Sequence, residues 1–303
     1  NPEIKLLVKN NSSGHSPKVE KMVKKAKFTF NKFNSPVIHQ LDLDEYIAKK
    51  LKIKKNNITF FRSEYDAIKK VVELFVTNYG EAIALYPCWS YFFIICNEKK
   101  ITMKQTVLKE MDKKSLQPDF FIAFRYITSK TKLIYLSSPN CTTGQSIDAK
   151  EFEKFIDKVP NNIIILIDQR FIEFSFNTKG LDPLKYLDKN VVVLRSFNNF
   201  YGLENLELAY IIANKNISNI LSRSQMLVNP IDQFTEDIAL TVMKDKQHQN
   251  YKSKKGMVKL DMQTANLLTQ VFKKINPKMK KILSDLGEKN PAQLVATLQA
   301  VVK

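Results

Sequence analysis

Helical and strand patterns alternate through most of this chain, and that alternation restricts its fold more than any other feature of the sequence. Apolar runs of strand length occupy residues 83–86, 133–136, 163–167 and 191–194. Most of them are followed by polar or turn residues, as buried strands of an α/β sheet usually are. Strands that alternate with helices favour a mainly parallel sheet covered by helices. We therefore expect a three-layer α/β/α fold.

The clearest helix start lies at Ser63. The segment Ser63-Glu-Tyr-Asp66 has the pattern of a capping box, in which side chains at the helix start accept hydrogen bonds from free backbone N–H groups. Apolar residues then recur at helical spacing as far as Phe75. In open α/β sheets ligands bind at the carboxyl ends of the strands, so functional residues are expected in the segments that follow the apolar runs.

The sequence changes character towards its C-terminus. Residues 245–256 are polar and charged, which predicts a linker. Helix-start signals follow at Asp261, Asn276-Pro277 and Asn290-Pro291, each with apolar residues at helical spacing after it. The expected division is a domain over residues 1–246, a linker over 247–256 and a three-helix module over 257–303.

The 303-residue chain carries a formal net charge of +18. Such a charge attracts phosphate backbones and other acidic partners, including nucleic acid. Nearly all of it is lysine, with arginine at only five positions, whereas recognition of bases and phosphates favours the planar fork of arginine. A solvated lysine coat is therefore the favoured interpretation, and an acidic partner is the alternative.

The sequence carries no membrane or metal signal. No apolar run approaches the ~18 residues of a membrane-spanning helix, so membrane insertion is not expected. The three cysteines and three histidines lack the spacing of a disulfide framework or a zinc site. A reducing compartment, the cytoplasm, is the expected location.

Four segments that follow the predicted strands resemble, in order, motifs of the fold-type-I aminotransferases, which use pyridoxal phosphate (PLP), and most closely those of the histidinol-phosphate aminotransferases. The segments are Tyr86-Pro-Cys-Trp-Ser-Tyr91, Ser138-Pro-Asn-Cys-Thr-Thr-Gly144, Asp168-Gln-Arg-Phe-Ile-Glu-Phe174 and Arg195-Ser-Phe-Asn-Asn-Phe-Tyr-Gly-Leu203. In the family the last three read N-P-N-N-P-T-G, D-E-A-Y-I-E-F and R-T-F-S-K-A-F-G-L. The resemblance covers about residues 4 to 245 and implies an aminotransferase-like α/β fold that is usually dimeric.

The resemblance also implies a PLP-binding lysine, which this chain lacks. The lysine forms a Schiff base with the cofactor and moves the proton, and the matching residue is Asn199. An amide nitrogen is neither nucleophilic nor basic. No lysine occurs from residue 190 to residue 214, so a small shift of the alignment does not restore one.

The family's phosphate anchor is altered as well. The helix start that holds the cofactor's phosphate in the family carries Ser63 and Glu64 here, and Glu207 stands at the position of a phosphate-binding arginine. Two unit charges about 4 Å apart interact by about 4 kcal/mol at an effective dielectric constant of about 20, so exchanging attraction for repulsion costs on the order of 8 kcal/mol. Glu64 is expected to replace the phosphate at the positive end of the helix dipole.

Further departures surround the ring position. Cys141 and Phe171 replace the asparagine and tyrosine that contact the ring hydroxyl in the family, and neither is a good donor to that oxygen. Asp168, the family's partner of the ring nitrogen, and Trp89, at the ring-stacking position, are retained; alternatively Asp168 caps a loop and Trp89 fills vacated space. The expected vestigial cofactor pocket consists of Ser63, Glu64, Trp89, Cys141, Asp168, Phe171, Asn198, Asn199 and Glu207.

These losses predict a pseudoenzyme. The expected protein is an inactive aminotransferase-like chain without PLP or a catalytic residue. We expect it to serve as a structural or binding subunit of an assembly such as a viral particle. It is expected to be able to form a homodimer and to be located in the cytoplasm or a virion. The first alternative is an aminotransferase-like enzyme with a remodelled pocket, a class I/II relative that binds PLP or pyridoxamine phosphate (PMP) without a Schiff base. The second alternative is a basic nucleic-acid-binding protein.

Overall fold

The computed structural model describes residues 15–26, 42–76, 79–112, 115–175, 180–225, 231–244, 249–253, 256–260, 276–289 and 294. The chain divides into two compact units. The first, called the sheet unit here, comprises residues 28–199 and 203–240; the second unit comprises residues 1–27, 200–202 and 241–303.

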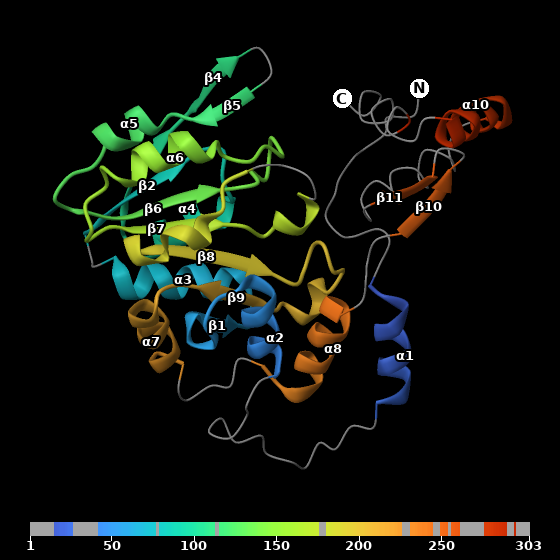
Figure 1. Cartoon of the computed structure of the whole chain (residues 1–303). Helices are drawn as coiled ribbons and strands as arrows, with labels where there is room; N and C mark the ends of the chain where they lie inside the picture. The colour runs from blue at the N-terminus through green and yellow to red at the C-terminus, as the bar shows by residue number, and fades with distance from the viewer. Residues whose placement is uncertain are drawn as a thin grey trace. The chain divides into compact units, whose positions relative to one another are not determined.

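A seven-stranded sheet forms the centre of the sheet unit, with helices around it (Figure 1). Its strands in spatial order are β1 (Ile58–Phe61), β9 (Ala209–Ile212), β8 (Val191–Ser196), β7 (Ile164–Asp168), β6 (Thr131–Ser137), β2 (Glu81–Leu85) and β3 (Thr102–Thr106). From β8 to β3 every neighbouring pair is parallel, while β9 runs antiparallel to both β8 and β1. The expected mainly parallel α/β sheet is therefore confirmed.

Each apolar run predicted to be a strand lies in or overlaps one, namely β2, β6, β7 and β8. The helices and 3-10 turns of this unit are α2 (Asp42–Leu51), η1 (Lys55–Asn57), α3 (Glu64–Phe75), α4 (Ser90–Glu98), α5 (Phe120–Arg125), α6 (Ala149–Ile156), η2 (Ile172–Phe174), η3 (Pro183–Lys189), η4 (Glu204–Leu206), α7 (Lys215–Arg223) and α8 (Gln233–Lys244), which continues into the second unit. A separate hairpin joins β4 (Leu108–Asp112) to β5 (Ser115–Pro118).

The hydrophobic core lies on both faces of the sheet. On one face, α3, α4 and α7 pack their apolar sides against alternate strand residues, for example Val71, Phe92 and Leu221 with Leu166. Side chains alternate along a strand, so Ile165 points to the opposite face, where it is 1% exposed. Burial on both faces explains why these strands read as continuous apolar runs.

Helix α3 begins where the capping pattern predicted. Ser63 is its N-cap residue, with extended backbone, and its hydroxyl accepts a hydrogen bond from the backbone N–H of Asp66 at 3.1 Å. This bond satisfies one of the free donors of the first turn. The helix is thereby fixed at the end of β1, and Glu64 is its first residue.

The second unit contains α1 (Pro17–Lys25), the hairpin of β10 (Gln249–Ser253) and β11 (Gly256–Leu260), and α10 (Pro277–Lys289). The hairpin overlaps residues 247–256, the predicted linker, and backbone pairing does not require an apolar sequence. The other two expected C-terminal helices lie almost wholly outside the described residues, so the three-helix module and the boundary at 246 stay predictions. Among the described helices, none has the length and apolar character needed to cross a membrane.

Candidate functional site

The segments that carry the resemblance meet at one edge of the sheet. Strands β6, β7 and β8 are parallel, so their carboxyl ends lie together. Ser137 at the end of β6 pairs with Asp168 at the end of β7. Phe61 and Ser196, the last residues of β1 and β8, both pair with Ala209 of the strand between them. The loops after β1, β6, β7 and β8 therefore start from the same edge.

Asp168 is the centre of a buried hydrogen-bond network at this edge. Its side chain is 1% exposed and accepts a hydrogen bond from the Tyr135 hydroxyl at 2.8 Å. The Arg170 side chain donates to it from Nε, at 2.9 and 3.0 Å, and from Nη2, at 2.8 Å. The backbone N–H of Arg170 adds a fourth donor at 3.0 Å. A buried carboxylate needs such a set of donors to offset the loss of water.

The guanidinium group of Arg170 also stacks on an aromatic ring. Its central carbon lies 4.0 Å from the centroid of the Trp89 ring and 5.6 Å from that of Phe171. Trp89 is the N-cap residue of α4 and is half-buried, whereas Arg170 is 5% exposed. Asp168 and Trp89, which sequence comparison with the family placed around a cofactor ring, therefore both contact one planar cation supplied by the chain itself.

Burial and the charge of Asp168 shift the pKa of Arg170 in opposite directions and the pKa of Tyr135 in the same direction. Burial disfavours the charged form of Arg170, but the neighbouring Asp168 carboxylate offsets this, so the pKa of Arg170 is raised. Glu64 adds a smaller effect of the same sign on the pKa of Arg170. Burial also raises the pKa of Tyr135, and the Asp168 carboxylate raises it further. Arg170 is therefore a permanent cation, and Tyr135 stays a neutral donor to Asp168.

Glu64 forms a second buried cluster, at the start of α3. One carboxylate oxygen accepts a hydrogen bond from the Ser196 hydroxyl at 2.6 Å, and the other accepts one from the Asn198 side-chain amide at 2.7 Å. The Ser196 hydroxyl in turn accepts from the backbone N–H of Asn198 at 2.9 Å. Glu64 is 7% exposed. A carboxylate thus occupies the first turn of α3, where the helix dipole favours negative charge.

Asn199 follows this cluster in the turn after β8 and is half-buried. Its neighbour Asn198 uses its amide nitrogen for Glu64, while its buried side-chain oxygen has no hydrogen-bond partner within the described residues. The turn therefore supplies amide groups where the family has the lysine.

The remaining expected site residues differ in their surroundings. Cys141 is exposed in the turn after β6, with its sulfur 3.8 Å from the Thr142 hydroxyl. Asn140 of this turn donates to the backbone oxygen of Pro87 at 2.7 Å, which ties the turn to the aromatic segment after β2. Glu207 is exposed beyond η4 in a left-handed conformation, and among the described contacts its side chain makes no hydrogen bond to the Glu64 cluster.

Sequence reasoning missed three partners of the predicted residues: Tyr135, Arg170 and Ser196. A signal for Arg170 was present, because an arginine replaces the small residue of the family's D-E-A-Y motif, two positions after Asp168. Tyr135 had no such signal, since a tyrosine inside an apolar strand is usually a core residue.

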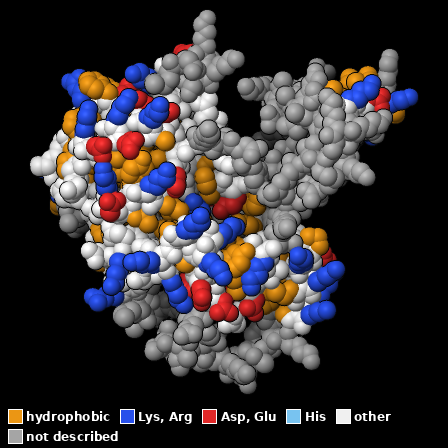
Figure 2. Space-filling view, in the orientation of Figure 1, with side chains coloured by type: hydrophobic (Ala, Val, Ile, Leu, Met, Phe, Trp, Pro, Cys, Tyr) orange, Lys and Arg blue, Asp and Glu red, His pale blue; other side chains and the backbone are white. Residues whose placement is uncertain are grey.

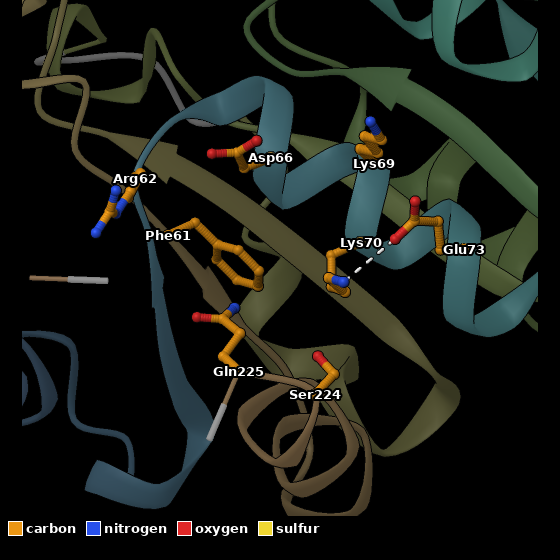
Figure 3. A pocket seen from close by; sticks show the side chains of 8 residues that line it. All are labelled: Phe61, Arg62, Asp66, Lys69, Lys70, Glu73, Ser224 and Gln225. Carbon is orange, nitrogen blue, oxygen red and sulfur yellow. Dashed lines mark ion pairs between the residues drawn. The ribbon is translucent and has the colours of Figure 1, made fainter. Parts of the chain in front are cut away.

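A surface pocket of about 380 Å³ lies elsewhere on the sheet unit (Figure 3). It is lined by Phe61, Arg62, Asp66, Lys69, Lys70, Glu73, Ser224 and Gln225. The close-up shows basic and acidic side chains together, with Lys70 paired to Glu73 at 3.2 Å. This pocket shares no lining residue with the Asp168 and Glu64 clusters. Within the described ranges, no group of three or more His, Cys, Asp or Glu side chains is arranged to hold a metal ion.

Comparison with known proteins finds similarity along most of the chain. The sequence profile of "Aminotransferase class I and II" matches residues 2–285. Histidinol-phosphate aminotransferase 2 of Haemophilus influenzae (strain 86-028NP) is 29% identical over 212 residues, which are 69% of this chain and 56% of that protein. Histidinol-phosphate aminotransferase 2 of Hydrogenovibrio crunogenus is 29% identical over 273 residues, 88% of this chain and 69% of that protein.

Solved structures agree on the fold. The crystal structure of histidinol-phosphate aminotransferase from Sinorhizobium meliloti in complex with pyridoxal-5'-phosphate superposes with a TM-score of 0.68 at 18% identity, covering 78% of this chain and 63% of that one. The resemblance to the histidinol-phosphate aminotransferases is thus confirmed. The chain spans little more than half the length of the Haemophilus relative.

These similarities correct the expectation of a pseudoenzyme without PLP that serves as a structural subunit, for instance in a viral particle. The similar proteins are named as aminotransferases, and the Sinorhizobium structure contains pyridoxal-5'-phosphate. The error was to take the joint loss of the lysine and the phosphate anchor as the loss of the whole site, because a ligand site is built from several groups, and Asp168 and Trp89 are retained. The alternative of an aminotransferase-like enzyme is the better supported one, since the chain belongs to the aminotransferase class I and II family.

Proposed function

We propose that the chain is an aminotransferase-like enzyme with a remodelled pocket, which binds PLP or PMP without a Schiff base to the protein. The observation that carries the proposal is the family match over residues 2–285 together with the retained pair of Asp168 and Trp89 at the carboxyl edge of the sheet. A carboxylate and an aromatic face suit the protonated ring of a pyridoxal cofactor.

The residues present do not fit PLP held by a lysine. Asn199 stands at the position of the family's lysine, and the nearest lysines along the sequence are Lys189 and Lys215. Lys189 forms an ion pair with Asp157. In addition, Glu64 occupies the helix start that would otherwise face a phosphate. Of the two cofactor forms, PMP is the more compatible one, because it brings its own amine.

We propose the reaction class of the family for this chain but no particular substrate. The matched residues span 56% of the Haemophilus relative. A homodimer and a cytoplasmic location, both expected from the sequence, belong to the same proposal. Sedimentation of the purified chain over a concentration series tests the dimer: a mass that stays near 35.1 kDa at all concentrations speaks against it.

Ligand binding is the direct test of the proposed function. Thermal unfolding is followed with and without PMP and PLP, since a ligand at 100 times its dissociation constant adds about 2.7 kcal/mol to the free energy of unfolding. We expect stabilisation by PMP, and no stoichiometric PLP modification of Lys189 or Lys215, the lysines that border segment 190–214, after borohydride reduction. The absence of stabilisation by either ligand contradicts the proposal, and a modified lysine contradicts its noncovalent part.

A substitution of Asp168 tests whether this residue contributes to PMP binding. We expect Asp168→Asn to weaken PMP binding by about tenfold or more, because the ring nitrogen loses its carboxylate partner. The control is Asp148→Asn, whose carboxylate caps α6 at the surface by accepting from the backbone N–H of Glu151 at 2.9 Å. Equal affinities of the two variants, measured by titration calorimetry, would show that the ligand does not use Asp168.

A further inference from the structure

A planar cation is held between an aromatic face and a carboxylate at the candidate site, and the cation is a side chain of the protein. The Arg170 guanidinium lies 4.0 Å from the Trp89 ring centroid and donates three hydrogen bonds of 2.8–3.0 Å to Asp168. Both charged residues are nearly inaccessible, at 5% and 1% exposure. Trp89 and Asp168 together therefore favour a flat, delocalised cation that stacks on the ring and pairs with the carboxylate.

The positions of Asp168 and Trp89 do not depend on the Arg170 side chain. Asp168 ends a strand of the parallel sheet, and it is held by the Tyr135 hydroxyl and by the backbone N–H of residue 170, which a substitution at that position leaves in place. Trp89 starts α4 and packs against the core cluster. Tyr135 is fixed in turn by stacking on Phe92, with ring centroids 4.3 Å apart. Removing the guanidinium therefore leaves a shaped, negatively charged space.

We propose that Asp168 and Trp89 form a planar-cation site that the Arg170 side chain fills in the free protein, and that a ligand with a planar cationic group binds by displacing this side chain. Arg170 then determines specificity, because a ligand must match both the stacking and the carboxylate pairing of a guanidinium. The protonated ring of PMP meets this requirement, and the choice of PMP as the ligand rests on the proposed function. The planar-cation site itself does not rest on the proposed function, because it is argued from the contacts of Arg170 alone.

A second buried carboxylate adds to the negative charge around Arg170. Glu64 lies at the start of α3, and its two oxygens accept hydrogen bonds from Ser196 and Asn198. Its charge acts on the pKa of Arg170 in the same direction as the charge of Asp168. The exchange of one cation for another at Asp168 preserves the charge balance of the site, which removal of the arginine alone does not.

The experiment uses Arg170→Ala and a matched control, Arg125→Ala. Arg125 is exposed, and its guanidinium lies 5.9 Å from the Phe121 ring centroid, so the control removes an arginine that faces an aromatic ring outside the site. Methylguanidine serves as the probe cation, with tetramethylammonium at the same ionic strength as a non-planar cation. Trp89 is the only tryptophan of the chain, so tryptophan fluorescence, excited selectively over tyrosine, reports on this site alone.

We expect methylguanidine to change the Trp89 fluorescence of Arg170→Ala in a saturable way, with an affinity about tenfold or more above that of wild type and of Arg125→Ala, since the site is then vacant. Tetramethylammonium should have no such effect. Equal responses of the three proteins overturn the proposal. If Arg170→Ala does not fold, Arg170→Met keeps the apolar stem and carries the same test, and a folded Arg170→Met that does not bind methylguanidine equally overturns it.

PMP titration of the same proteins separates this inference from the proposed function. Tighter PMP binding to Arg170→Ala than to wild type supports both. Methylguanidine binding without PMP binding supports the planar-cation site and contradicts the proposed cofactor. PMP binding of equal strength in wild type and Arg170→Ala overturns the displacement of Arg170 while the proposed function stands.

Discussion

At the residue scale, charge balance at a buried position decides what Arg170 does. A lone carboxylate in the interior is costly, and Asp168 is surrounded by Arg170, Tyr135 and a backbone N–H instead of water. The same rule applies to Glu64, whose two oxygens are satisfied by Ser196 and Asn198. The substitution at Glu64 relative to the family pattern is thus accompanied by neighbours that satisfy its carboxylate.

Restoring the lysine at position 199 tests whether Arg170 competes with the cofactor ring for Asp168. Asn199→Lys supplies a nucleophilic amine, but Arg170 still pairs with Asp168, so we expect little covalent attachment of PLP at position 199. The double variant Asn199→Lys/Arg170→Ala should carry about tenfold more attached PLP, because the ring then has a free carboxylate partner. Mass spectrometry after borohydride reduction measures both, with Asn199→Lys/Arg125→Ala as the control. A single variant that is as fully modified as the double one would show that Arg170 does not compete.

At the element scale, loops and helix ends are fixed by side chains from distant segments. The start of α2 is an example: the carboxylate of Glu236 in α8 accepts a hydrogen bond from the backbone N–H of Leu43 at 2.9 Å. Glu236 is 1% exposed. It therefore satisfies a free donor at the positive end of another helix, as a cap within α2 itself would do.

The pKa of Glu236 is raised, first by burial, although hydrogen bonds from Leu43 and Asp42 act to lower it. A raised pKa means that the folded state holds the proton more tightly, so this contribution to stability is present below the unfolded pKa of about 4.3 and is lost as the pH rises through the folded pKa. Glu236→Gln does not titrate. We expect the unfolding free energy of wild type, relative to Glu236→Gln, to fall between pH 4 and pH 7 in urea titrations; a constant difference would contradict this.

At the scale of the whole molecule, the sheet brings the site together and the surface remains mixed in charge. On the face shown in Figure 2, lysine and arginine side chains are interspersed with aspartate and glutamate. Exposed pairs such as Lys154 with Glu151, at 2.8 Å, are of the kind that contributes little to stability. The positive charge on this face is therefore interspersed with negative charge, as in a solvated lysine coat.

The sheet core carries the stability of the sheet unit. Leu166 lies in β7, the middle strand of the seven, and is 0% exposed. We expect Leu166→Ala to lower the free energy of unfolding by about 2–5 kcal/mol, because it leaves a cavity between sheet and helices. The control Ile220→Ala, at a residue 46% exposed on α7, should change it by no more than about 0.5 kcal/mol. Urea unfolding measures both, and similar losses would mean that the core does not lie where the structure places it.

Local patterns in the sequence were enough to predict the four apolar strands, the start of α3 at Ser63 and the family resemblance, because periodicity and capping depend on residues a few positions apart. The contacts that define the site depend on long-range packing. Glu64 and Ser196 are 132 residues apart in sequence and meet because β1 and β8 flank β9. Arg170 reaches Trp89 only because the loops after β2 and β7 start from one sheet edge. A single substitution such as Glu64 was visible in the sequence, but its partners Ser196 and Asn198 became visible only when the tertiary structure placed them beside it.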